Sequence, residues 1–158
     1  MIRYVPADHN DVEQMYRLDM LCFEPPFRFA RSTFDYLMSN PDVIAIKAVD
    51  DGRGLVGFIV LEPEPPELAC VATIDVHPHA RREGIGGELM RRVADAARAI
   101  GLSKVYLHVY VGNTSAQEFY RGLGYESRQL LPSFYGPGRH AYLMVLADVA
   151  AERAGNVV

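Results

Sequence analysis

Several features that mark other classes of protein are missing from this chain of 158 residues. Its two cysteines, Cys22 and Cys70, form no metal-binding or disulfide pattern. No apolar run approaches the roughly 18 residues of a membrane-spanning helix, and residues 1–6 are not a signal peptide. Basic residues form no block and the net charge is -4, which argues against a nucleic-acid surface. We therefore expect a globular cytoplasmic protein with no metal and no nucleic-acid or membrane partner.

One glycine-rich segment stands between an apolar run, Val71–Val76, and a helical pattern that begins at Ile85. It matches neither the dinucleotide fingerprint nor the P-loop. A helix start leaves backbone N–H groups unpaired and carries partial positive charge. The glycines within residues 84–87 let an anion approach the backbone, and Arg81 and Arg82 add positive charge. The segment predicts a cradle for a phosphate-like group; the alternative is a tight turn whose glycines serve packing.

The pattern Arg81-x-x-Gly84-x-Gly86 resembles the [QR]-x-x-G-x-[GA] loop with which GNAT acetyltransferases grip the pyrophosphate of acetyl-CoA. The resemblance implies acetyl-CoA as co-substrate, with the strand before the loop running antiparallel to its pantetheine arm. It also implies that the Val76 N–H can reach the acetyl carbonyl. The implied cofactor-binding residues of this segment are Ile74, Asp75, Val76, Arg81, Arg82, Glu83, Gly84, Ile85, Gly86 and Gly87.

The hydrophobic pattern predicts an α/β fold with mixed strand directions. This order of elements resembles the GNAT fold, a mostly antiparallel central sheet with flanking helices, in a single domain over residues 1–147 before a C-terminal tail, 148–158. We expect Asp8 and Asp11 to form a capping box and Ser32 to cap a second helix, and Pro63 to end a strand. The expected strands cover residues 2–5, 43–49, 55–61, 68–76, 104–109, 127–131 and 141–146, and the expected helices cover about 12–22, 33–39, 85–100 and 114–123.

The second half of the chain resembles the protein N-terminal acetyltransferases, both RimI-like and NatE-like. The residues that carry this likeness are Leu107-His108-Val109, Asn113-x-x-Ala116-x-x-Phe119-Tyr120-Arg121-x-x-Gly124-Tyr125, Phe134-Tyr135 and His140-Ala141-x-x-Met144. The resemblance implies that Asn113, Ala116 and Tyr120 contact the cofactor, that Tyr120 lies near its sulfur, and that Phe134 and Tyr135 hold the first residues of the substrate. It places His108 where NatE-like enzymes have a catalytic histidine and RimI-like enzymes a glutamate. It also places Cys70 where NatE-like enzymes have a second catalytic group, a tyrosine, which a buried thiol replaces poorly.

Two further sets of residues have alternative interpretations. In the aromatic, proline-stiffened segment 23–29, Pro26, Phe27 and Phe29 could wall a substrate pocket or plug the core. His108 alone would be an ordinary strand histidine and Tyr120 alone a core aromatic. Beside the anion cradle we assign both a catalytic role.

These residues fit the acetylation of an amine. A histidine of ordinary pKa, about 6.5, is matched to an α-amine of pKa ~7.7–8.0 and poorly matched to a lysine of pKa ~10.4. A tyrosine hydroxyl can assist the departing thiolate. We predict an acetyl-CoA-dependent N-acetyltransferase, a monomer or homodimer, whose partner is a protein N-terminus. The alternatives are acetylation of a small-molecule amine or a lysine side chain, or an acetyl-CoA sensor without turnover.

Overall fold

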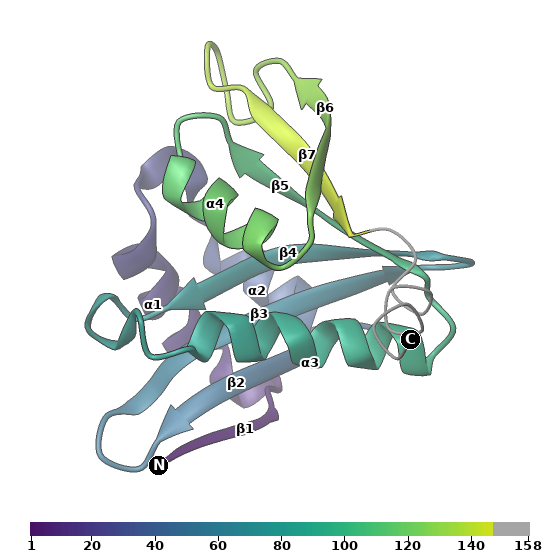
Figure 1. Ribbon diagram of the computed structural model, residues 1–158. Coiled ribbons are helices and arrows are strands. Elements are labelled where there is room, and N and C mark those ends of the chain that lie inside the picture. Colours follow the sequence, from purple (N-terminus) through teal and green to yellow (C-terminus); the bar gives the residue numbers. More distant parts are fainter. Residues whose placement is uncertain (147–158) are drawn as a thin grey trace. The chain divides into compact units, whose positions relative to one another are not determined.

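The structure is a computed structural model that describes residues 1–146 (Figure 1), so the predicted tail, 148–158, lies outside the described residues. The strands and helices follow one another in the predicted order. The strands are β1 (Ile2–Pro6), β2 (Ile44–Asp50), β3 (Gly54–Glu64), β4 (Leu68–Val76), β5 (Lys104–Tyr110), β6 (Glu126–Leu131) and β7 (Ala141–Leu146). The helices are α1 (Val12–Cys22), α2 (Arg31–Ser39), α3 (Ile85–Ala99) and α4 (Thr114–Gly122), with 3-10 turns η1 (His9–Asp11), η2 (Pro25–Phe27) and η3 (Pro78–Ala80).

The strands form one seven-stranded sheet, hydrogen-bonded in the order β1-β2-β3-β4-β5-β7-β6. The pairs β1–β2, β2–β3, β5–β7 and β6–β7 are antiparallel. Strands β4 and β5 are parallel, where Leu68–Cys70 pair with Lys104–Tyr106. A parallel pair needs a crossover connection, and α3 supplies it. The predicted α/β fold with a mostly antiparallel sheet and flanking helices is confirmed.

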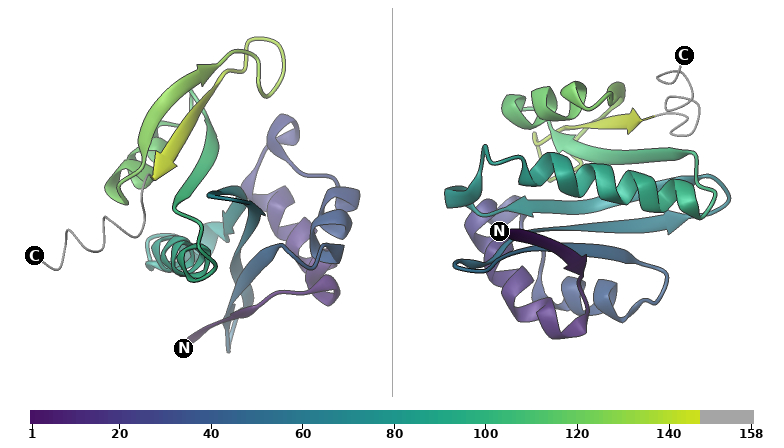
Figure 2. Two further views of the ribbon diagram at one scale, coloured as in Figure 1. Left: turned by 90° about the vertical axis from the view of Figure 1, so that its right-hand side faces the viewer. Right: turned by 60° about the horizontal axis from the view of Figure 1, so that its bottom comes forward.

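The chain forms two compact units, of which the first holds residues 1–62 and 72–95. In this unit α1 and α2 lie on one face of the strands and the beginning of α3 lies on the other (Figure 2). The Phe34 ring of α2 meets the Phe58 ring of β3 edge-on, with centroids 5.8 Å apart. The buried core under α1 and α2 consists of Val12, Met15, Leu18, Phe34, Leu37, Ala45, Phe58 and Val60.

The second unit holds residues 63–71 and the described residues from Ala96 onward. Strand β5 alternates here: Val105, Leu107 and Val109 are buried, whereas Lys104, Tyr106, His108 and Tyr110 are half-buried on the opposite face. The buried side chain of Gln117 on α4 donates to the carbonyl oxygens of Tyr110 and Val111, at 3.2 and 2.9 Å. The end of β5 is therefore fixed to α4, and His108 lies on the face opposite the buried one.

Of the predicted helix caps and strand ends, one is confirmed and two are wrong. The capping box of Asp8 and Asp11 is confirmed, although it starts η1, which leads into α1. The prediction that Ser32 caps α2 is wrong: the cap position is Ala30, without a side-chain bond, and Ser32 lies in the first turn. The chain is held one residue earlier, where the Phe29 N–H donates to Asp19 at 2.8 Å, so a tertiary contact sets the helix start. Strand β3 continues through Pro63 to Glu64, so the prediction that Pro63 ends the strand is wrong. Proline has no N–H to donate, and a strand can contain it where no ladder hydrogen bond is needed from that residue.

Candidate functional site

The backbone between β4 and α3 has the form of an anion cradle. Arg82 and Gly84 adopt the left-handed region, with φ angles of 65° and 84°. The Gly84 carbonyl accepts the hydrogen bond of the Glu88 N–H at 3.1 Å, so α3 begins immediately after it. The N–H groups of that first turn have no acceptor within the helix. A Cβ atom added to Gly84 or Gly87 would meet no heavy atom within 4 Å, so the space beside the helix start fits an anionic group.

Side chains of this loop hold its shape. The Glu83 carboxylate accepts hydrogen bonds from both terminal nitrogens of Arg53, at 2.8 and 3.0 Å, and these bonds lower the pKa of Glu83. Arg53 also pairs with Asp50, which ties the loop to the turn between β2 and β3. The Arg81 Nε donates to the Val76 carbonyl at 3.3 Å. Because the Glu83 carboxylate is bonded to Arg53, the predicted cofactor contact of Glu83 would be made by its backbone.

The end of β4 has two half-buried side chains, Ile74 and Val76, on either side of a buried one. Asp75 is only 1% exposed, and the Thr73 hydroxyl donates to its carboxyl group at 2.7 Å. Its side chain therefore points into the first unit. A cofactor contact of Asp75 is possible through its backbone, as for Ile74 and Val76.

Gly57 on β3 is a residue that the sequence did not single out. A Cβ atom at this position would lie 2.9 Å from the Asp75 carbonyl oxygen and 3.2 Å from Cγ2 of Ile85. Ile85 itself is buried at the start of α3. The absence of a side chain at Gly57 thus lets β3 approach both flanks of the anion cradle.

The aromatic segment 23–29 is compact, with η2 in its middle. Pro26 is exposed and Phe27 is half-buried. Phe29 packs against the core of the first unit, with its ring centroid 5.6 Å from that of Phe34. Phe29 therefore has a packing role, while Pro26 and Phe27 present the surface that an acceptor wall would need.

His108 lies in an aromatic setting within the second unit. Its ring stacks on that of Phe134, with centroids 4.3 Å apart and planes at 18°. Tyr106, on the same face of β5, meets the imidazole edge-on at 5.7 Å. Burial lowers the pKa of His108, and the nearby charge of Glu64 opposes this as the smaller effect. The imidazole is therefore neutral at neutral pH and able to accept a proton.

Tyr106 and Glu64 extend this cluster beyond the predicted residues. The Tyr106 hydroxyl lies 2.8 and 2.7 Å from the two oxygens of the Glu64 carboxylate. Burial is the main cause that raises the pKa of Tyr106, and hydrogen bonds to Glu64 and Cys70 add to it. Burial likewise raises the pKa of Tyr135 to about 12. Both hydroxyls thus stay protonated, and Cys70 is a hydrogen-bonding partner of Tyr106.

The predicted residues of α4 lie along one helical stripe. The Asn113 Oδ1 caps the helix by accepting from the Ala116 N–H at 3.1 Å. Ala116 and Tyr120 follow at spacings of three and four residues, and both are half-buried. The Tyr120 ring lies between Phe119 and Tyr125, with centroids 5.3 and 6.1 Å away. The stripe fits the predicted contact with an extended cofactor arm.

Each unit thus gathers its own share of the predicted site. Two residues near the site were not predicted from the sequence, although each had a weak signal there. Tyr106 lies on the same strand face as His108, and Asp19 interrupts the apolar stripe of α1. The first unit holds Pro26, Phe27, Phe29, Ile74, Asp75, Val76 and the loop Arg81 to Gly87, and the second holds His108, Asn113, Ala116, Tyr120, Phe134 and Tyr135.

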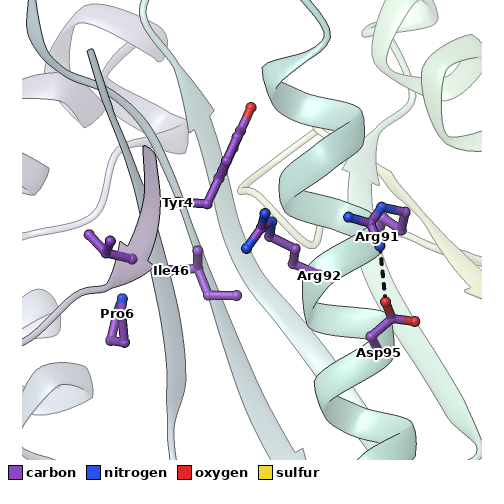
Figure 3. Close-up of a pocket in the computed structure, with 7 residues that line it drawn as sticks. Tyr4, Pro6, Ile46, Arg91, Arg92 and Asp95 are labelled. Atoms are coloured by element: carbon purple, nitrogen blue, oxygen red, sulfur yellow. Dashed lines mark hydrogen bonds and ion pairs between the residues drawn. The ribbon is translucent and has the colours of Figure 1, made fainter. Parts of the chain in front are cut away.

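A separate hollow of about 440 Å³ lies in the first unit, away from the predicted residues (Figure 3). Arg91 pairs with Asp95 at 3.1 Å, and the Arg92 guanidinium lies 4.7 Å from the Tyr4 ring centroid. Both arginines also bond to Glu88, so their charge is already balanced. The hollow is lined by Tyr4, Val5, Pro6, Ile46, Arg91, Arg92 and Asp95.

Residues 1–146, the part of the chain that the structure describes, have neither a cluster of metal ligands nor a membrane-spanning helix. No three histidine, cysteine or acidic side chains in this part of the chain are grouped so that they could hold a metal ion. Among the helices described there, none is both long and apolar enough to cross a membrane.

Comparison with known proteins gives a consistent result. The profile of the Acetyltransferase (GNAT) family matches residues 12–125. The chain is 36% identical to an N-alpha-acetyltransferase of Sulfurisphaera tokodaii, covering 85% of this chain and 86% of that protein. It is also 36% identical to the N-alpha-acetyltransferase RimI of Mycobacterium tuberculosis, with 85% of each covered. Other relatives are longer: the chain spans 37% of an uncharacterised Mycobacterium leprae protein, 31% identical, and 26% of the mycothiol acetyltransferase of Corynebacterium glutamicum.

Solved structures share the fold. The ribosomal-protein-S18-alanine N-acetyltransferase of Escherichia coli superposes with a TM-score of 0.84 at 20% identity, over 94% of both chains. NAA60 of Arabidopsis thaliana in complex with acetyl-CoA gives a TM-score of 0.83 at 23% identity, over 93% of this chain and 98% of that one. The expected GNAT fold is therefore confirmed.

Proposed function

Because the chain belongs to the GNAT acetyltransferase family, we propose that it transfers the acetyl group of acetyl-CoA to the N-terminal α-amine of a protein or peptide. The observation that carries the choice of acceptor is the state of His108, a half-buried imidazole whose pKa is lowered by burial. The two N-alpha-acetyltransferases that match 85% of the chain support the same choice.

The acceptor must lose a proton before it attacks, and this favours an α-amine. The pKa of an α-amine is ~7.7–8.0, against ~10.4 for a lysine side chain. Near neutral pH the α-amine is therefore easier to neutralise by about 2.5 units, or about 3.4 kcal/mol. A neutral histidine of low pKa is a weak base that suffices for the first task and not for the second.

Acetyl-CoA supplies the activated thioester on which the reaction depends. The backbone of residues 82–87 and the charges of Arg81 and Arg82 would bind its pyrophosphate, and Asn113 and Ala116 would line its arm. His108 would take the proton of the acceptor amine on an imidazole nitrogen, directly or through a water. The Tyr120 hydroxyl would hold the proton needed by the departing sulfur, since a phenol can assist the departure of a thiolate of pKa ~8.5.

The test is acetyl transfer to peptides that differ in their first two residues, each also made with a blocked N-terminus. We expect acetylation of free α-amines and none of the blocked peptides, even where they contain lysine. His108→Gln should lower the rate about 100-fold or more, whereas His9→Gln, a change at an exposed histidine of the first unit, should not. If the protein acetylated only blocked lysine peptides or only polyamines, those amines would be its acceptors and the proposed α-amine would be excluded. Binding of acetyl-CoA without any turnover would reduce the protein to a sensor.

A further inference from the structure

Two carboxyl groups meet inside the first unit without a buried cation. Asp19 lies on α1 and Asp75 near the end of β4, and each is 1% exposed. Their side chains are hydrogen-bonded to each other. The charged groups that face them are Arg28 for Asp19 and Arg81 for Asp75, both exposed residues, and the Cys22 thiol faces both acids. The side chains of this pair have no part in the function proposed above.

The four carboxyl oxygens show how the two groups are bonded. One oxygen of Asp19, Oδ2, accepts the Phe29 N–H at 2.8 Å, and one of Asp75, Oδ1, accepts the Thr73 hydroxyl at 2.7 Å. The other two, Asp19 Oδ1 and Asp75 Oδ2, are buried and receive no hydrogen bond from any residue outside the pair among residues 1–146. Two carboxyl oxygens can bond only through a proton, so one proton lies between them.

Simple electrostatics assigns that proton to Asp75. Two adjacent buried carboxylates cannot both be ionised, and the pKa of one must rise. Burial is the main cause that raises the pKa of Asp75 far above its usual range, and the bond to Asp19 adds to it. The pKa of Asp19 is raised less, because its hydrogen bonds to Asp75 and the Phe29 N–H favour its ionised form. Asp75 is therefore the neutral donor and Asp19 the charged acceptor.

The pair joins two segments of the candidate site. Asp19 accepts a hydrogen bond from the Phe29 N–H and so holds the end of residues 24–29, the part of the aromatic segment that follows Phe23. Asp75 lies beside Val76, whose carbonyl oxygen accepts from the Cys22 thiol and from Arg81 Nε, each at 3.3 Å. The end of α1, the segment 24–29 and the end of β4 are thus one bonded network within the first unit.

We propose that Asp19 and Asp75 are positioning residues for the reaction. Their shared proton fixes the segment 24–29, which would wall the pocket of the acceptor amine, against the strand residues Ile74–Val76, which would hold the acetyl group. This inference rests on the proposed function for what the two segments bind. The shared proton also makes a prediction that needs no substrate. Because the pKa of Asp75 is higher in the folded chain than in the unfolded chain, its stabilising contribution is complete below the unfolded value. That contribution is lost as the pH rises through the folded value.

Substitutions at Asp75 separate the proton from the shape of the side chain. In Asp75→Asn the amide can still accept from Thr73 and donate to Asp19, and it cannot lose that hydrogen. Asp75→Leu keeps the branching of the side chain at Cγ, although it is larger, and leaves the Asp19 carboxylate without its donor. Asp42→Asn, on an exposed residue of the same unit, is the matched control.

Infrared spectroscopy and hydrogen exchange test the pair without an acceptor. The wild type and Asp42→Asn should show the carbonyl band of a neutral carboxylic acid at neutral pH, and Asp75→Asn should lack it. Amide exchange in the segment 24–29 should be at least about tenfold faster in Asp75→Leu and unchanged in Asp75→Asn. Asp75→Asn should also keep its thermal stability to higher pH than the wild type. Wild-type protein without the neutral-acid band, or equal exchange in all variants, would overturn the proposal whatever the acceptor is.

Kinetics then tests positioning in the reaction. Asp75→Leu should lower kcat/KM for a peptide about tenfold to 100-fold, since a small misplacement of reacting groups costs that much. Its affinity for acetyl-CoA should stay within about twofold, and Asp75→Asn should restore kcat/KM and keep its activity at alkaline pH. Equal losses in Asp75→Asn and Asp75→Leu would show that the shared proton positions nothing. Should Asp75→Leu fail to fold, Asp75→Ala, which likewise leaves the Asp19 carboxylate without its donor, replaces it with the same expected exchange and kinetic changes.

Discussion

Gly87 offers a test in which stability and cofactor affinity should change in opposite directions. It is the third residue of α3, and an added Cβ would meet no protein atom within 4 Å. Gly87→Ala should therefore stabilise the helix by about 0.5–1 kcal/mol, which raises Tm by about 1–4 °C in a chain of this size. The same methyl group would occupy the space through which an anion reaches the N–H groups of the first turn. Loss of one such charge-assisted bond, about 1.5–3 kcal/mol, weakens binding about tenfold to 100-fold.

The measurements are titration calorimetry with acetyl-CoA and thermal unfolding of each variant. Gly122→Ala is the matched control, because Gly122 ends α4 with equally open space at its Cβ position; it should leave affinity unchanged. Gly84→Ala should lose both affinity and stability, since its φ of 84° costs an L-residue about 1–2 kcal/mol. If Gly87→Ala gains stability and binds acetyl-CoA as tightly as the wild type, the loop is a packing turn and the cradle is wrongly assigned.

Three further predictions concern the second unit. The acidic limb of kcat/KM should lie below pH ~6.5, because burial lowers the pKa of His108; His108→Gln should remove it, and a persisting limb would exclude His108 as the base. Phe134→Ala exposes the imidazole and should move this limb to higher pH, whereas Glu64→Gln removes a nearby negative charge and should move it lower. Shifts of the same sign in both pH profiles would contradict that account. Tyr135→Ala should raise the KM for peptide several-fold more than the KM for acetyl-CoA, and initial-rate kinetics with each substrate varied would show whether both KM values rise together instead.

Local signals were enough to predict the strand-to-helix turn at residues 76–85 and the strand face of His108. The change from an apolar strand to a helical pattern needs only neighbouring residues, and β4 (Leu68–Val76) has the predicted bounds. Alternation on β5 put His108 on the face opposite Leu107 and Val109, where the structure has it.

Contacts between distant parts of the chain were beyond such signals. The Tyr106–Glu64 bond joins residues 42 positions apart, and the bond between Asp19 and Asp75 depends on α1 packing beside the end of β4. Phe29 shows the same limit: its sequence allowed a plug or a pocket wall, and its packing against Phe34 is seen only in the fold. Residue type and spacing identify chemistry along one element, whereas the partner across the fold is fixed by packing.

The close approach at Gly57 has a consequence for how this chain can vary among its relatives. With the Asp75 carbonyl 2.9 Å and Ile85 Cγ2 3.2 Å from any Cβ placed there, a substitution at position 57 must displace backbone as well as a side chain. Trimming Ile85 relieves only the second of these contacts. In a library that randomises positions 57 and 85 together, smaller residues at 85 should not rescue alanine at 57, so glycine should be retained at position 57 whichever residue stands at 85.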